Sequence, residues 1–147
     1  METPLNIENE ILISAPVAAV WDILTNPEKT VLYMYGCVVV SEWKPGDSIL
    51  WIGSQDDVTY VKGEIVEIDP GHKLVYTVID PQGKYPDIPE NYLTVTYTLA
   101  QDGDKTMLKV TQGDYAKVAE GEKRYKESES QGGWQSVLDA VKELAEA

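Results

Sequence analysis

The stretch GGWQSVLDAVKELAEA, residues 132–147, carries the one strongly periodic helical pattern in this chain. Its apolar side chains recur at the i, i+3, i+4, i+7 spacing of one helical face, and its charged side chains fall on the other faces. A helix this one-sided needs an apolar partner surface, so we expect it to pack on a sheet built by the preceding chain. The apolar members are Trp134, Val137, Leu138, Val141, Leu144 and Ala145.

Several upstream segments show the two-residue alternation or the β-branched content typical of strands. In residues 91–100 every second side chain, from Leu93 to Leu99, is apolar or aromatic, and the others are mainly threonine. Gly63 lies inside another such segment and indicates a bulge or a close approach by the helix, because glycine otherwise weakens a strand. The predicted strands are residues 5–14, 34–43, 48–53, 58–69, 73–79, 91–100 and 105–113.

Two short helices are predicted between the first two strands. Pro16 suits a first helical turn, and residues 17–24 repeat apolar side chains on one face. Asn26-Pro27 ends this helix and can start the next, expected over residues 28–33. The polar residues 114–131 leave two alternatives open: the first half of one long helix, or a separate helix divided from the last one by Gly132-Gly133.

Several motifs in this order resemble a known family. Residues 15–28, APVAAVWDILTNPE, are similar to the opening motif of the helix-grip fold, also called START-like or Bet v-like. Pro45-Gly46-Asp47 resembles its first hairpin turn, residues 63–74 its next hairpin, and Gly133-Trp134 its C-terminal signature. Together they resemble the short bacterial branch of the family named after the activator of heat-shock-protein-90 ATPase, within the SRPBCC superfamily.

The resemblance implies an α+β helix-grip fold, with a curved antiparallel sheet of about seven strands around a long C-terminal helix. We expect a single domain over residues 1–147. The family name implies a stress-related chaperone partner or another protein partner. In the eukaryotic namesake, however, a separate N-terminal domain contributes to chaperone binding, and we expect no such domain within these 147 residues. Homodimerisation stays open.

Charge and composition limit the kinds of partner and cofactor that we expect this chain to bind. Twenty-five acidic and twelve basic side chains give a net charge of −13, which repels nucleic acid and anionic membrane surfaces. The N-terminus lacks the basic and apolar regions of a signal peptide, so a cytoplasmic location is expected. One cysteine, Cys37, excludes an internal disulfide, and one histidine, His72, cannot by itself build a metal site. We therefore expect no cofactor.

The aromatic set is nine tyrosines, four tryptophans and no phenylalanine, so every aromatic ring brings a polar atom. This composition suits an amphipathic cavity, and the resemblance to the helix-grip fold implies that the cavity lies between helix and sheet. The alternative is that the inward side chains meet in the centre and leave no cavity. The expected ligand-binding residues are Tyr33 near the mouth, together with Trp51, Tyr76, Tyr97, Trp134 and Leu138.

The sequence leaves three classes of function open. The first is a domain that binds a small apolar or amphipathic molecule. The second is a cyclase or hydrolase that uses the same cavity, although no catalytic residue is assigned. The third is a chaperone-interacting or other protein-binding domain. For the first class, we predict that Tyr97→Ala weakens binding and that Tyr92→Ala, on the opposite strand face, does not.

Overall fold

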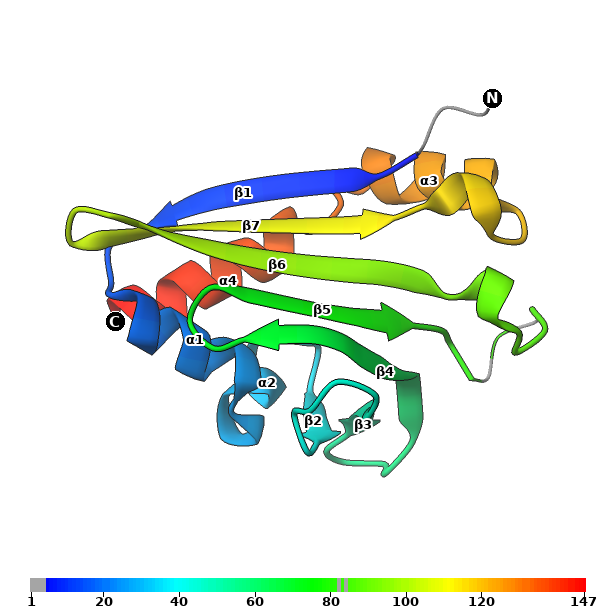
Figure 1. Ribbon diagram of the computed structural model, residues 1–147, viewed down its shortest axis with the longest axis horizontal. Coiled ribbons are helices and arrows are strands. Elements are labelled where there is room, and N and C mark those ends of the chain that lie inside the picture. Colours follow the sequence, from blue (N-terminus) through cyan, green and yellow to red (C-terminus); the bar gives the residue numbers. More distant parts are fainter. Residues whose placement is uncertain (1–4, 82, 84) are drawn as a thin grey trace.

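The structure is a computed structural model that describes residues 5–81, 83 and 85–147 (Figure 1). The described chain contains seven strands, four α-helices and two short 3₁₀ helices. Their bounds are β1 (Ile7–Ile13), α1 (Val17–Thr25), α2 (Pro27–Tyr33), β2 (Cys37–Ser41), β3 (Ser48–Gly53), β4 (Thr59–Asp69), β5 (Lys73–Val78), η1 (Pro89–Asn91), β6 (Leu93–Asp102), β7 (Lys105–Gly113), η2 (Tyr115–Lys117), α3 (Gly121–Ser130) and α4 (Gln135–Glu146).

The strands form one antiparallel sheet in the order β1-β7-β6-β5-β4-β3-β2. Strands β2 to β7 are neighbours in the sheet in their sequence order. The last strand, β7, also pairs with the first, β1, where Gln112 lies opposite Ile7. The alternation predicted for β6 is confirmed, because Leu93, Val95, Tyr97 and Leu99 are buried. The expected α+β architecture, a curved antiparallel sheet with a C-terminal helix, is therefore the one observed.

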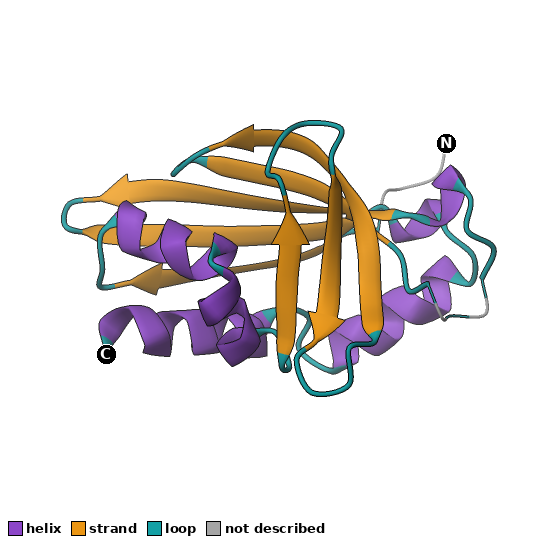
Figure 2. Ribbon diagram, turned by 90° about the horizontal axis from the view of Figure 1, so that it is seen from below, coloured by secondary structure: helices purple, strands orange, loops and turns teal. Residues whose placement is uncertain are grey.

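Strand β4 bends sharply and changes partner along its length. Its first part pairs with β3 up to Glu64, and its second part pairs with β5 from Ile65 onward. Figure 2 shows β2, β3 and the adjoining part of β4 running across the direction of the other strands. A Cβ on Gly63 would lie 1.6 Å from the Thr77 carbonyl oxygen. Of the two alternatives for Gly63, the close approach is thus made by β5 rather than by a helix, and the strand register shifts nearby, between Ile65 and Glu67.

The apolar stripe of α4 packs into the main core. Val137, Leu138 and Val141 are buried, and α4 lies against β1, α1 and α2. Trp134 is half-buried and stands at the N-cap position of the helix. The predicted packing of the final helix on the sheet is confirmed.

Glycines separate α3 from α4. Gly132 and Gly133 have φ angles of +89° and +61°, a region in which residues with a Cβ are strained. A Cβ on Gly133 would also lie 2.6 Å from Ile7 Cγ2. The chain thus forms two helices here, so the second alternative holds. The segment between β7 and α3 also buries Tyr115 and Val118 in a small second cluster, which the polar sequence of residues 114–131 did not indicate.

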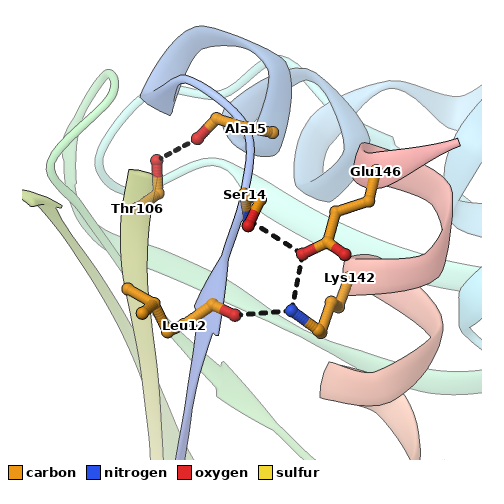
Figure 3. Close-up of polar contacts among 6 residues, drawn as sticks. All are labelled: Leu12, Ser14, Ala15, Thr106, Lys142 and Glu146. Atoms are coloured by element: carbon orange, nitrogen blue, oxygen red, sulfur yellow. Dashed lines mark hydrogen bonds and ion pairs between the residues drawn. The ribbon is translucent and has the colours of Figure 1, made fainter. Parts of the chain in front are cut away.

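Polar contacts fasten the last turn of α4 to the end of β1 (Figure 3). The Ser14 backbone N–H donates to Glu146 Oε2 at 2.8 Å, and Lys142 Nζ donates to the Leu12 carbonyl oxygen at 2.9 Å. Nearby, the buried Thr106 hydroxyl donates to the Ala15 carbonyl oxygen at 2.8 Å. This end of the molecule is closed by packing and by hydrogen bonds.

Within the described residues, no helix combines the length and the apolar character needed to cross a membrane.

Candidate functional site

A cavity of about 640 Å³ lies between the sheet and the start of α4. Its walls come from strands β3 to β7 together with Trp134, the N-cap residue of α4, and its edge is formed by residues 34–37 and 53–60. The exposed rings of Tyr35 and Tyr60 mark the opening. A volume of this size matches the range found for small-molecule sites, which is roughly 300–1,000 Å³.

Four aromatic rings form a continuous row beside the cavity. Trp51 and Tyr76 have ring centroids 6.2 Å apart, and Tyr76 and Tyr97 have the same separation. Tyr97 and Trp134 meet edge to face at 5.9 Å. The row connects β3, β5, β6 and α4, so it ties the far strands of the sheet to the helix. These four rings are the ones that the sequence analysis placed together.

The six predicted site residues divide into two groups. Trp51, Tyr76 and Trp134 line the cavity. Tyr97 lies behind them, only 1% exposed, and Leu138 is fully buried one turn along α4. Tyr33 is buried in the core, where its hydroxyl donates to the Leu24 carbonyl oxygen at 2.8 Å.

Tyr35, rather than Tyr33, stands at the opening. Its side chain is 78% exposed, and its hydroxyl lies 3.1 Å from Ser136 Oγ of α4. The backbone of Tyr35 has a φ angle of +51°, a left-handed conformation that helical spacing does not anticipate. That turn ends the helix and directs the ring across the edge of the cavity.

Sequence reasoning missed Gln112, which lies on the inward face of β7. It lines the cavity and pairs with Val95 of β6 in the sheet register. The signal was present in the sequence, because Gln112 continues the two-residue spacing of Leu108 and Val110. A polar residue at this place in an apolar row needs a hydrogen-bond partner. Its carbonyl oxygen accepts from Trp134 Nε1 at 3.0 Å and from the Tyr115 hydroxyl at 3.2 Å.

The buried tyrosine hydroxyls next to the cavity stay protonated. Burial raises the pKa of Tyr33, Tyr76 and Tyr97 well above the ordinary value. The Tyr97 hydroxyl lies near enough to the Tyr76 hydroxyl to affect its pKa, yet in the described part of the chain it meets no partner in hydrogen-bond geometry. These groups therefore offer neutral hydrogen-bonding atoms rather than charges.

The charged residue at the cavity is Asp56, at its edge. The Tyr60 hydroxyl donates to its carboxylate, and the Val58 backbone N–H donates to Oδ1 at 3.1 Å. The Tyr60 hydrogen bond, followed by the backbone one, lowers the pKa of Asp56 below its ordinary value. Asp56 is thus ionised at neutral pH, and none of the described residues that line the cavity is basic.

Two other residues singled out in the sequence have ordinary surroundings. Cys37 is buried at the cavity wall, and burial, with a smaller effect of Asp56, raises the pKa of its thiol. His72 lies in an exposed turn, where its ring Nδ1 is 3.2 Å from the Pro70 carbonyl oxygen. Over residues 5–81, 83 and 85–147, no three His, Cys, Asp or Glu side chains gather in a way that could hold a metal ion.

The fold and the cavity agree with a match at the level of sequence families. The family described as "Activator of Hsp90 ATPase homolog 1-like protein" matches residues 14–146. This chain belongs to that family. Membership supports a ligand-binding or interaction domain, which is the coarse reading that the sequence motifs implied. No curated protein matches the chain.

Solved structures share the same architecture. A protein from Cytophaga hutchinsonii, known from a solution structure, is 36% identical with a TM-score of 0.76, over 97% of this chain and 94% of that one. CalU16 from Micromonospora echinospora is 18% identical with a TM-score of 0.68, over 95% and 75% of the two chains. The Aha1 dimer from Colwellia psychrerythraea is 13% identical with a TM-score of 0.71, over 96% of each chain. At under 25% identity, the last two show a shared fold.

Proposed function

We propose that this protein binds an uncharged or weakly polar small molecule in the cavity between sheet and α4, without a covalent step. The observation that carries the proposal is the cavity of about 640 Å³, with an apolar and aromatic wall and a few neutral polar groups. Small-molecule sites have this composition, because apolar surface supplies affinity and a few polar atoms supply orientation. Trp51, Tyr76 and Trp134 are the wall residues, and Tyr97 and Leu138 support them from behind.

The charges around the site favour a neutral ligand over an anion. Asp56 stands ionised at the edge, and the whole chain carries a net charge of −13. In the part of the chain that the structure describes, no basic side chain lines the cavity to compensate a buried anion. Burying an unpaired charge costs far more than burying a neutral group of the same shape.

A pair of dyes that differ in one charge tests this proposal. N-phenyl-1-naphthylamine is neutral, and its 8-sulfonate derivative is an anion of nearly the same shape. We expect the neutral dye to bind with a rise in its fluorescence, and the anion to bind at least about tenfold more weakly. The substitution Asp56→Asn should narrow that difference, because it removes the negative charge at the edge. Equal binding of both dyes to the wild-type protein would contradict the proposal.

Two matched tryptophan substitutions test the place of binding. Val61 lines the cavity, whereas Val66 lies on the same strand, β4, with 53% of its surface exposed. Val61→Trp should fill the cavity and abolish dye binding, and Val66→Trp should leave it unchanged. A cooperative thermal unfolding transition in both variants would verify that they are folded. Binding that survives in Val61→Trp would show that the dye sits elsewhere.

A second candidate is a protein-interaction role. It is favoured by the exposed apolar side chains of Leu32 and Tyr35, 62% and 78% exposed at the end of α2. The Colwellia psychrerythraea relative is described as a dimer. Light scattering of this protein, compared with Leu32→Ser, tests whether the same surface joins two copies. A monomer at high concentration would remove the self-association form of this candidate.

A further inference from the structure

The side-chain amide of Gln112 is held in one orientation by two donors on the same oxygen. The indole N–H of Trp134 can only donate, so the Gln112 atom 3.0 Å away must be the carbonyl oxygen. The Tyr115 hydroxyl, 3.2 Å from the same oxygen, then donates as well. The oxygen thereby fills both of its lone pairs, and rotation of the amide would place two donors against each other.

The other half of this amide is its NH₂ group, which carries two donors. Among the described residues it has no hydrogen-bond partner, although the Gln112 side chain lines the cavity. Its neighbours on the inward face, Val95 and Val110, offer no acceptor side chain. A polar donor beside an apolar wall is satisfied by whatever occupies the cavity.

We propose that Gln112 is a specificity-determining residue, and that its N–H donates to a carbonyl oxygen, or a comparable neutral acceptor, on a ring-bearing ligand. The inference deepens the proposed function and rests on it. The aromatic row supplies a surface for the ring through Trp51, Tyr76 and Trp134. Gln112, held by Trp134 at one end of that row, supplies the donor that orients the ligand.

The test uses two neutral probes that differ in one oxygen. One is 6-propionyl-2-(dimethylamino)naphthalene, a ketone, and the other is its 6-propyl analogue, in which CH₂ replaces the carbonyl. For the wild-type protein we expect the ketone to bind roughly three- to tenfold more tightly, the usual worth of one net hydrogen bond. Equal affinities for the two probes would overturn the proposed role of Gln112.

The informative variant is Gln112→Glu, because an ionised carboxylate still accepts from Trp134 and Tyr115 but offers no donor. We expect it to lose the ketone preference at high pH and to regain it as the carboxyl group becomes protonated and can donate. The other titratable groups at the cavity keep their charge between about pH 5 and 8. Burial raises the pKa of Cys37, Tyr76 and Tyr97, burial also raises that of Tyr115, and hydrogen bonding raises that of Tyr60 and lowers that of Asp56. A ketone preference that persists in the ionised variant would contradict the inference.

An infrared measurement on the wild-type protein keeps the proposal open to refutation even if the variant fails to fold. The carbonyl stretch of the bound ¹³C-labelled ketone should lie at a lower frequency than in an alkane, as it does in hydrogen-bonding solvents. A band at the position seen in an alkane would overturn the inference. The failure of both probes to bind, or binding that survives Val61→Trp, would instead overturn the proposed function itself, so the two failures are distinguishable.

Discussion

The two ends of the concave face of the sheet are packed in opposite ways. At the end where β1 leads into α1, the side chains of Ile13, Val20, Leu108 and Val141 are completely buried, and Figure 3 shows polar contacts closing the edge. At the other end, beside Trp134, the same face leaves about 640 Å³ unfilled. The comparison shows that the apolar stripe of α4 completes the core, while Trp134 at the start of the same helix lines a cavity.

The difference between the ends comes from the size of the side chains and from the bend in the sheet. The closed end is filled by branched aliphatic residues, which interdigitate at high density. At the open end the lining includes Gly36, Cys37 and Gly53, which occupy little volume. The large rings there pack against one another along the wall, and beyond the bend in β4 the strands β2 and β3 run across the direction of the other strands.

The largest expected effect is a difference in stability between two side-chain truncations, one at each end of the sheet. Leu138→Ala should lower the free energy of unfolding by about 2–5 kcal/mol, because it opens a new void in a packed region. Val78→Ala, at the cavity wall, should cost less than about 1.5 kcal/mol, since Val78 already borders empty space. Urea-induced unfolding measures both. Equal losses for the two variants would mean that the two ends are packed alike.

Residue patterns predicted the closed end well and the open end only in part. Local periodicity determines which side of β6 or α4 is apolar, so the buried positions of these two elements followed from the sequence. Whether inward rings meet or leave a space depends instead on the bend of β4 and on distances between strands far apart in the chain. The inward position of Gln112 could be read from the spacing in β7, but its hydrogen bonds could not, because Trp134 and Tyr115 reach it only through tertiary packing.

The next expected effect compares two buried hydroxyls. The Tyr33 hydroxyl donates to the Leu24 carbonyl oxygen at 2.8 Å, so Tyr33→Phe should lower the free energy of unfolding by about 1–2 kcal/mol. The Tyr97 hydroxyl is buried without a partner in the described structure, so Tyr97→Phe should leave stability unchanged or raise it by up to about 1 kcal/mol. Chemical denaturation of the ligand-free protein provides both values.

A loss of stability in Tyr97→Phe equal to that in Tyr33→Phe would show that the Tyr97 hydroxyl is satisfied in solution. The outcome bears on the open end of the molecule. An unsatisfied hydroxyl behind Tyr76 is a polar group that a ligand, or a rearrangement caused by one, can satisfy. If Tyr97→Phe raises stability but weakens ligand binding, the hydroxyl is kept for recognition at the expense of stability, as is common at functional sites.

The smallest expected effect concerns the polar contacts of the closed end and depends on pH. The Lys142 ammonium, followed by the Ser14 backbone N–H, lowers the pKa of Glu146 below its ordinary value of 4.5. Because the folded-state pKa is lower than the unfolded one, the contribution to stability is fully present above about pH 5 and disappears as the pH falls through the folded-state pKa. Glu146→Gln should therefore melt slightly below the wild-type protein at pH 7, and the two melting temperatures should converge in acid.

Glu143→Gln, on the exposed face of the same helix, makes the same change in net charge and serves as the control. If both variants lower the melting temperature at pH 7 to the same extent, the effect arises from overall charge, and the contacts in Figure 3 do not hold the end of α4 to β1.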